Sequence, residues 1–115
     1  PRPMRLQTLA TASLALFAGT VLAVGAPKGR IAAGKQRFEA TPEGGQACAS
    51  CHLEGGAKSI DGNTPLLAGQ YADYLRVSLI AYQRGDRKNP IMAGIAKPLS
   101  RQDIENLSAY FASLP

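Results

Sequence analysis

Apolar side chains recur at helical spacing in three segments of this chain. The first segment, residues 29–39, places small and apolar residues on one helical face at Ile31, Gly34 and Phe38. The second, roughly residues 70–84, has an apolar face formed by Tyr71, Tyr74, Leu75, Leu79 and Tyr82. Gly85 follows at once and is placed to end this helix. We therefore expect two amphipathic helices before residue 86.

The third segment begins after Ser100 with strong helix-start signals. Ser100 is a good N-cap, and Asp103 three residues later gives a weaker form of the capping box. Leu99 and Ile104 have the spacing of a hydrophobic staple across that cap. The apolar face continues through Ile104, Leu107, Phe111 and Leu114. This pattern predicts a C-terminal helix.

The remaining segments have no regular hydrophobic period. Residues 41–45 read Thr-Pro-Glu-Gly-Gly and break the first helix, and a polar, glycine-rich loop occupies residues 53–64. Residues 86–99 are predicted to form another loop. No run of four or more residues alternates apolar and polar side chains as a strand would. The sequence thus predicts an all-α fold with three to five short helices and long loops.

The N-terminal part of the chain has a different pattern. Residues 6–27 are uncharged and rich in Leu, Ala and Val, and Arg2 and Arg5 stand before them. A positive start, an apolar stretch and small residues at its end are typical of a secretory signal. We expect a signal peptide at residues 1–26, a mature domain at 27–115, and a periplasmic location. The alternative is a retained membrane anchor, since about 20 apolar residues can span a bilayer.

The charge of the chain favours a protein partner over nucleic acid. The full chain has 13 Lys and Arg residues against 8 Asp and Glu residues, a formal net charge of +5. Loss of Arg2 and Arg5 with the signal leaves 11 basic against 8 acidic side chains, a net charge of +3. These basic residues form no stripe, which argues against nucleic acid. A weakly cationic face that steers an acidic protein partner suits this charge better. Arg84, Arg87 and Lys88 offer charges for pairing with a partner or with the carboxylates of a bound group, and we interpret them as a solvated cluster.

Residues 47–53, Ala-Cys-Ala-Ser-Cys-His-Leu, contain the only cysteines and the only histidine of the chain. A disulfide between Cys48 and Cys51 would close too short a loop to stabilise much. A thioredoxin-like redox pair needs a βαβ setting, and no strand is predicted. A structural zinc site needs four ligands, and this motif offers three. Cys-x-x-Cys-His is the attachment signature of a c-type haem.

The spacing of this motif has a physical reason. Residues three apart on a helical turn share a face, so the thiols of Cys48 and Cys51 can add to the two vinyl groups on one haem edge. His52 then projects under the ring and can bind iron. Met92 is the only methionine after residue 4 and lies in the predicted 86–99 loop, where Pro90 stiffens the chain. Core-filling methionines normally sit on helical faces, and Met92 is predicted to lie in a loop. We therefore interpret Met92 as the sixth iron ligand. A histidine–methionine pair of ligands raises the reduction potential of the haem.

With these residues, the sequence resembles a class I c-type cytochrome of the small bacterial single-haem kind. It is particularly similar to single domains of dihaem c-type cytochromes, over about residues 29–115. The resemblance implies that Cys48 and Cys51 form the thioethers, that His52 is the proximal ligand, and that Met92 is the distal ligand. It also implies that the carbonyl of Pro65 accepts a hydrogen bond from the other ring nitrogen of the histidine, which fixes the ring orientation.

Further matches concern the packing of the helices around the haem. Leu67 matches a leucine that packs against the haem. Gly34 and Phe38 match first-helix positions that cross the last helix, where Leu107 and Tyr110 match their partners. The resemblance therefore implies the small cytochrome c fold, wrapped around one covalently bound haem c.

The expected function is electron transfer between transient redox protein partners, a donor and an acceptor. We expect no enzymatic activity, because the only histidine is committed to iron and no nucleophile-and-base pair remains. Two alternatives stay open. One is a haem subunit of a larger dehydrogenase or oxidase, which a retained membrane anchor would favour. The other is a gas-binding or sensor module, against which Met92 argues.

Overall fold

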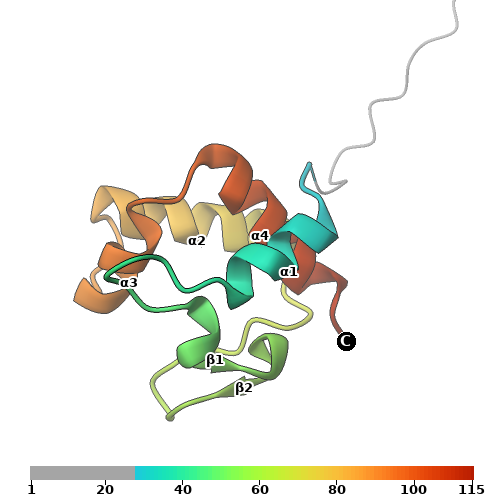
Figure 1. Cartoon of the computed structure of the whole chain (residues 1–115), viewed down its shortest axis with the longest axis horizontal. Coiled ribbons are helices and arrows are strands. Elements are labelled where there is room, and N and C mark those ends of the chain that lie inside the picture. Colours follow the sequence, from blue (N-terminus) through green and yellow to red (C-terminus); the bar gives the residue numbers. More distant parts are fainter. Residues whose placement is uncertain (1–27) are drawn as a thin grey trace, which may run out of the picture.

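The computed structural model describes residues 28–115 of the chain, so the signal segment predicted at 1–26 lies outside the described residues. The described part contains four α-helices, α1 (Ile31–Glu39), α2 (Ala72–Arg84), α3 (Pro90–Ala96) and α4 (Arg101–Ser113) (Figure 1). Strands β1 (His52–Leu53) and β2 (Lys58–Ser59) pair in antiparallel orientation. Two 3₁₀ turns, η1 (Cys48–Ser50) and η2 (Glu54–Gly56), alternate with these strands. The predicted all-α fold with long loops is confirmed, and the two-residue strands are too short for alternation to reveal them.

Helices α1 and α4 cross in direct contact because α1 has a glycine at the crossing point. A Cβ atom on Gly34 would lie 2.0 Å from the carbonyl oxygen of Asn106, which only a residue without a side chain avoids. One turn later, the Phe38 ring meets Phe111 edge to face with ring centroids 5.3 Å apart. The backbone N–H of Arg30 also donates to Oδ1 of Asn106 at 2.8 Å. The expected packing of the first helix on the last is therefore present.

Helix α2 only partly follows its predicted apolar face. Leu75 and Tyr82 are buried, whereas Tyr71 and Tyr74 are 84% and 52% exposed. Tyr71 precedes the first helical residue, and packing covers only one side of α2 in the described residues. Gly85 ends the helix in the left-handed conformation with φ of 77°, as its position predicts.

Helix α4 begins as its sequence indicates. The Ser100 hydroxyl accepts a hydrogen bond from the Asp103 N–H at 3.0 Å, and the Asp103 carboxylate accepts one from the Ser100 N–H at 3.0 Å. Leu99 and Ile104, the two predicted staple residues, are both buried in the core. The capping box is therefore complete, and it fixes the direction in which α4 leaves the preceding segment.

The prediction of a loop throughout residues 86–99 is wrong, because α3 occupies its middle. Asn89 caps α3, since its side-chain oxygen accepts a hydrogen bond from the N–H of Met92 at 3.0 Å. Pro90 fills the first helical position, where its fixed φ suits a helix and its missing N–H costs nothing. Met92 consequently lies in the first turn of a short helix and not, as predicted, in a loop.

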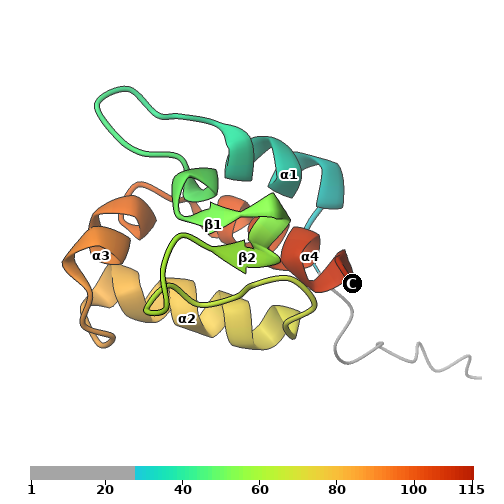
Figure 2. The same ribbon diagram turned by 90° about the horizontal axis from the view of Figure 1, so that it is seen from below.

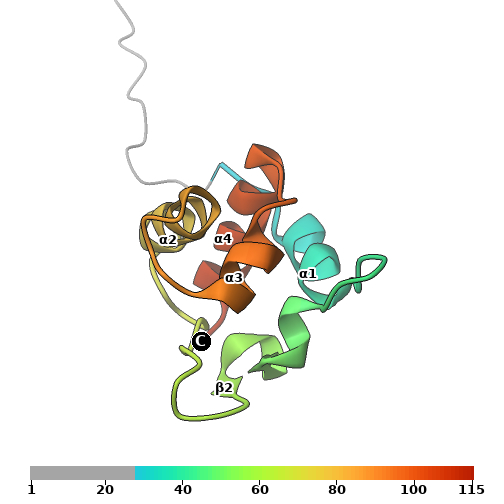
Figure 3. The same cartoon turned by 90° about the vertical axis from the view of Figure 1, so that its left-hand side faces the viewer.

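The segment that carries β1 and β2 lies on one side of the helices in Figures 1 and 3. Figure 2, seen from that side, shows this segment in front, with α1 and α2 to either side of it in the view and α3 beside α2. Figure 3, seen from the α3 side, shows α4 between α1 and α2 and the β2 segment at some distance from these helices. Within residues 28–115, no helix combines the length and the apolar character needed to cross a membrane.

Candidate cofactor site

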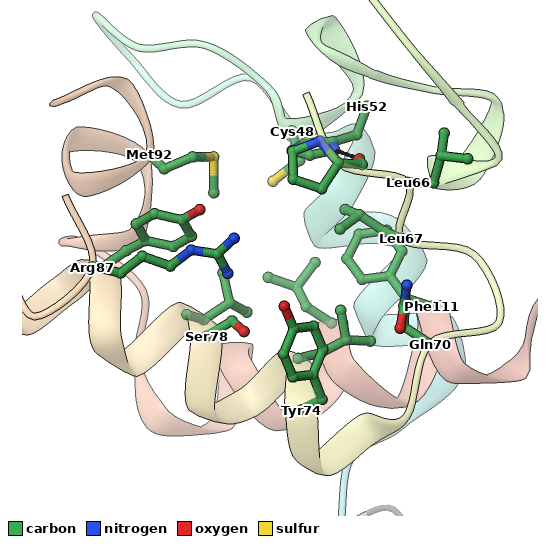
Figure 4. Close-up of a pocket in the computed structure, with 15 residues that line it drawn as sticks. Cys48, His52, Leu66, Leu67, Gln70, Tyr74, Ser78, Arg87, Met92 and Phe111 are labelled. Carbon is green, nitrogen blue, oxygen red and sulfur yellow. Dashed lines mark hydrogen bonds between the residues drawn. The ribbon is translucent and has the colours of Figure 1, made fainter. Parts of the chain in front are cut away.

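An apolar pocket lies between the cysteine motif, the segment after Thr64, and helices α2, α3 and α4. Most of its lining is hydrocarbon, contributed by Leu66, Leu67, Leu75, Leu79, Leu107 and Phe111. The motif contributes Cys48 and His52, and α3 contributes Met92 (Figure 4). A second hollow shares these three residues and also includes Cys51. The residues predicted to hold a haem therefore border two hollows that share Cys48, His52 and Met92.

The two cysteines lie on one tight turn. The N–H of Cys51 donates to the carbonyl of Cys48 at 3.3 Å, and both half-buried side chains are free thiols. Burial raises the pKa of the Cys48 thiol, and the positive charge of Arg37 acts in the opposite direction. Burial therefore favours the neutral form of the Cys48 thiol. The sulfur of Cys48 points into the pocket in Figure 4.

The other interpretations of the motif find little support in the described residues. No disulfide joins Cys48 to Cys51, and the strands beside them form an antiparallel pair instead of a βαβ unit. Within residues 28–115, no group of three or more His, Cys, Asp and Glu side chains is placed to hold a metal ion. A disulfide staple, a thioredoxin-like pair and a structural zinc site therefore all fit this structure less well than a haem.

His52 is buried, with 5% of its surface exposed, and is held in one orientation. Its ring nitrogen Nδ1 lies 2.9 Å from the carbonyl oxygen of Pro65. Burial lowers the pKa of the imidazole, and the hydrogen bond to the Pro65 carbonyl partly opposes this shift. A neutral ring that donates its Nδ1 proton to Pro65 keeps the lone pair of Nε2 for a metal. The backbone of His52 is fixed as well, because β1 pairs it with Ser59.

A hydrogen-bonded turn presents the Pro65 carbonyl to His52. The carboxylate oxygen Oδ1 of Asp61 accepts hydrogen bonds from the N–H of Asn63, the N–H of Thr64 and the hydroxyl of Thr64, each at 2.9 Å. These bonds, led by that from the Thr64 hydroxyl, lower the pKa of Asp61. On the other side of Pro65, the N–H of Leu67 donates to the Gly56 carbonyl at 2.8 Å. The predicted haem-packing Leu67 is half-buried and borders the pocket.

Met92 is half-buried and borders both hollows. Figure 4 shows Met92 and His52 on either side of one space, with the sulfur of Cys48 between them in this view. The structure thus brings the predicted set of Cys48, Cys51, His52 and Met92 together from segments up to forty-four positions apart. A thioether and a neutral imidazole across an apolar pocket, next to two thiols, are a donor set that fits a haem.

The interpretation of Arg84, Arg87 and Lys88 as a solvated cluster holds for two of the three residues. Arg84 and Lys88 are exposed. Arg87 instead is half-buried, borders both hollows, and places its guanidinium 4.9 Å from the centre of the Tyr82 ring. Nothing in the local sequence distinguishes it from its basic neighbours, because the difference comes from the turn after α2.

Comparisons with known proteins agree with this geometry. The family model of cytochrome c matches residues 31–115. Cytochrome c-554(547) of Halothiobacillus neapolitanus is 37% identical over 97 residues, which cover 75% of this chain and 98% of that protein. The thiosulfate dehydrogenase electron acceptor of Thiomonas intermedia (strain K12) is 34% identical over 94 residues, covering 82% of this chain and 43% of that protein. The crystal structure of reduced cytochrome c4 from Pseudomonas stutzeri matches with a TM-score of 0.68 and 34% identity, over 74% of this chain and 48% of that one.

The chain belongs to the cytochrome c family, and one haem c is its cofactor, attached through Cys48 and Cys51. It spans less than half the length of several curated relatives, such as 43% of the Thiomonas protein and 36% of cytochrome c4 from Stutzerimonas stutzeri. Other relatives, such as the Halothiobacillus cytochrome, are matched over nearly their whole length.

Proposed function

We propose that this protein carries single electrons between redox proteins. The observation that supports this most strongly is the pairing of two side chains in one apolar pocket. A buried imidazole, tied through Nδ1 to Pro65, shares that pocket with the thioether of Met92. When bound, the haem supplies an iron that alternates between the ferric and ferrous states by one electron. His52 and Met92 are the residues that would bind this iron.

The residues around these ligands have distinct roles in the proposal. Pro65 orients the imidazole and makes it a stronger donor, because the hydrogen bond it accepts leaves more electron density on the ring. Leu67 and the other aliphatic residues exclude water from the pocket, which favours the less charged ferrous state. Met92 donates a soft sulfur that favours the same state. All three effects depend on groups that the fold already holds in position.

The partner surface is proposed to lie around the second hollow. Ile60 and Ile91 are 57% and 63% exposed and border this hollow together with Cys51. Lys88, also on its border, adds a positive charge beside these aliphatic side chains. Small surfaces of this kind suit brief redox encounters, and the positive charge would attract an acidic partner. The name of the Thiomonas relative supports a redox enzyme as the donor.

The proposed location is the periplasm, with residues 1–26 as a cleaved signal and residues 27–115 as the haem domain. A second arrangement is supported by the lengths of the relatives. Because the chain matches less than half of several of them, the domain can also work as a haem unit beside another domain or subunit. In both arrangements the domain transfers electrons and makes no bond in a substrate.

A redox titration of protein made with haem-attachment machinery tests this function. We expect the mass of one covalently bound haem, a reversible one-electron titration, and rapid electron exchange with a reduced redox protein. Carbon monoxide should bind the native ferrous protein poorly, because Met92 would compete with it for the iron. Protein without attached haem, or ready carbon monoxide binding by the native form, would contradict the proposal.

A further inference from the structure

The helix that carries Met92 has little apolar packing of its own. Helix α3 has seven residues, and Ala96 is the one residue of this helix that is buried. Met92 itself is half-buried. A helix of this length is not stable alone, so contacts with the rest of the fold must hold it. The position of the Met92 sulfur therefore depends on how α3 is attached to its neighbours.

The N-terminal end of α3 is fixed by a local bond. The side-chain oxygen Oδ1 of Asn89 accepts a hydrogen bond from the N–H of Met92 at 3.0 Å. This bond starts the helix at a defined residue. Because it joins two residues of the same short segment, it does not set the position of α3 relative to α2.

The C-terminal end of α3 is tied to α2 by the side chain of Gln83. The Nε2 nitrogen of Gln83, in the last turn of α2, donates to the carbonyls of Ala96 and Leu99, each at 2.8 Å. Ala96 ends α3, Leu99 precedes the cap of α4, and both residues are buried. Figures 1 and 2 show α3 next to the C-terminal end of α2. One half-buried amide group thus joins α2, the end of α3 and the segment before α4.

The loss of these two bonds would disturb the support of Met92. A carboxamide has two N–H donors on its nitrogen, one for each carbonyl. A buried carbonyl that loses its donor costs more free energy than the bond contributes when it is formed. Ala96 and Leu99 belong to the buried core, and Met92 packs against that core. Movement of the end of α3 away from α2 would therefore also move Met92 relative to the pocket.

We propose that Gln83 is a positioning residue for Met92. By holding the end of α3 against α2, it keeps the thioether at the pocket and thereby controls how readily a small ligand binds in place of Met92. Gln83 borders neither hollow, so this effect acts through α3 and not through contact with the cofactor. The proposal rests on the proposed function, since it requires Met92 to bind the iron.

Three substitutions of Gln83 separate hydrogen bonding from shape. Gln83→Leu removes both donors. Gln83→Glu keeps the shape of the side chain, but the ionised carboxylate presents only acceptors to the two carbonyls. Gln83→Lys changes the shape and keeps N–H donors, with a positive charge that suits the C-terminal end of a helix. Hydrogen bonding therefore predicts that the lysine replaces glutamine better than the glutamate does.

Two control substitutions lie away from α3. Gln102→Leu is the matched control, because the Nε2 nitrogen of Gln102 donates at 2.8 Å to Asn106 within α4 and Gln102 borders neither hollow. Gly34→Ala controls for a general loss of stability, because its Cβ would strike the crossing of α1 and α4.

Two measurements on the haem-loaded proteins report on Met92 and on α3 separately. Imidazole titrated into the ferric protein competes with Met92, so its apparent affinity rises with the fraction of molecules in which the thioether has left the iron. Hydrogen exchange at the amides of residues 92–97 reports the local opening of α3 without reference to the iron. Urea unfolding records the global stability of each protein.

We expect Gln83→Leu and Gln83→Glu to raise the affinity for imidazole about tenfold and to speed exchange at residues 92–97. Gln83→Lys should stay closer to the unsubstituted protein than either of them, and Gln102→Leu should match the unsubstituted protein. Gly34→Ala should lower the global stability and leave the affinity for imidazole unchanged. If Gln83→Leu does not fold, the comparison of Gln83→Glu with Gln83→Lys decides.

The proposal is overturned if the glutamate variant binds imidazole no more tightly than Gln102→Leu does, or if Gly34→Ala raises the affinity as much as the Gln83 substitutions do. Unchanged exchange at residues 92–97 would overturn it as well. Failure of the electron-transfer function is recognised separately, because it appears in the unsubstituted protein as missing haem or a missing methionine band.

Discussion

The Nδ1 nitrogen of His52 lies 2.9 Å from the carbonyl oxygen of Pro65, thirteen positions later in the chain. This bond sets both the orientation of the imidazole and its strength as a donor. Pro65→Gly keeps the carbonyl but frees the backbone angle that the proline ring fixes. We expect a weaker hydrogen bond, a less basic imidazole and therefore a higher reduction potential, measured by potentiometric titration.

Pro42→Gly is the matched control for this change. Pro42 lies in the turn after α1, where its carbonyl accepts a hydrogen bond from the N–H of Gly45, and it does not border the apolar pocket. This substitution should leave the potential unchanged. If both substitutions move the potential equally, the Pro65 carbonyl has no special role.

A methyl group at the crossing of α1 and α4 should be poorly tolerated. The Cβ of Gly34→Ala would lie 2.0 Å from the Asn106 carbonyl oxygen, so the two helices must separate. We expect a loss of about 1–3 kcal/mol or more in the free energy of unfolding, measured with urea on the haem-loaded protein. A stability equal to that of the unsubstituted protein would show that the crossing is looser than the structure indicates.

Gly94→Ala provides the contrasting case. Gly94 lies within α3, and no heavy atom comes within 4 Å of a Cβ built there. The substitution should raise the free energy of unfolding by about 0.5–1 kcal/mol, because alanine loses less backbone entropy in a helix. Destabilisation here would mean that α3 moves or is covered in the haem-loaded protein.

The turn at Asp61 should make stability depend on acid pH. Its hydrogen bonds lower the pKa of the carboxylate below the ordinary 3.8, so the unfolded chain binds a proton at higher pH than the folded chain. The stabilisation is therefore complete above pH 3.8 and is lost as pH falls through the lower folded value. Asp61→Ala should lower the melting temperature near pH 7, and the difference from the unsubstituted protein should shrink in acid. A difference that stays constant down to pH 2 would contradict this account.

Removal of the haem should largely unfold the domain. The four helices are 7 to 13 residues long, and isolated helices of that length are marginal in water. Packing around the cofactor is expected to stabilise them. We expect far-ultraviolet circular dichroism of haem-free protein, made without the attachment machinery, to show little helix. Native-like helicity would mean that the contact between α1 and α4 suffices alone.

Sequence patterns predicted best those features that depend on local chemistry. The cap at Ser100 and the stop at Gly85 each follow from one residue and its near neighbours. The close helix crossing at Gly34 is a tertiary contact with Asn106, and it was expected only from the family resemblance. The wrong prediction of a loop at α3 is also local, since Asn89 is a good N-cap and Pro90 suits the first helical position.

The half-buried position of Arg87 at the pocket could not be predicted in this way. Its difference from Arg84 depends on the turn that follows Gly85 and on the ring of Tyr82, which only the folded chain brings together. The exposure of Tyr71 has a similar origin, because a helical pattern cannot show which part of its face other elements cover. The burial of Arg87 and the exposure of Tyr71 both depend on which elements pack against them in the folded chain.

The central claim is that His52 and Met92 face each other as ligands, and the visible spectrum of the ferric protein tests it most directly. The unsubstituted protein should show the weak red band of a methionine–ferric bond, and Met92→Ala should abolish the band and lower the reduction potential. Ile91→Ala, at the exposed neighbouring position, should keep the red band and the reduction potential of the unsubstituted protein. An unsubstituted protein without the band, or a Met92→Ala protein that keeps it, would contradict the account.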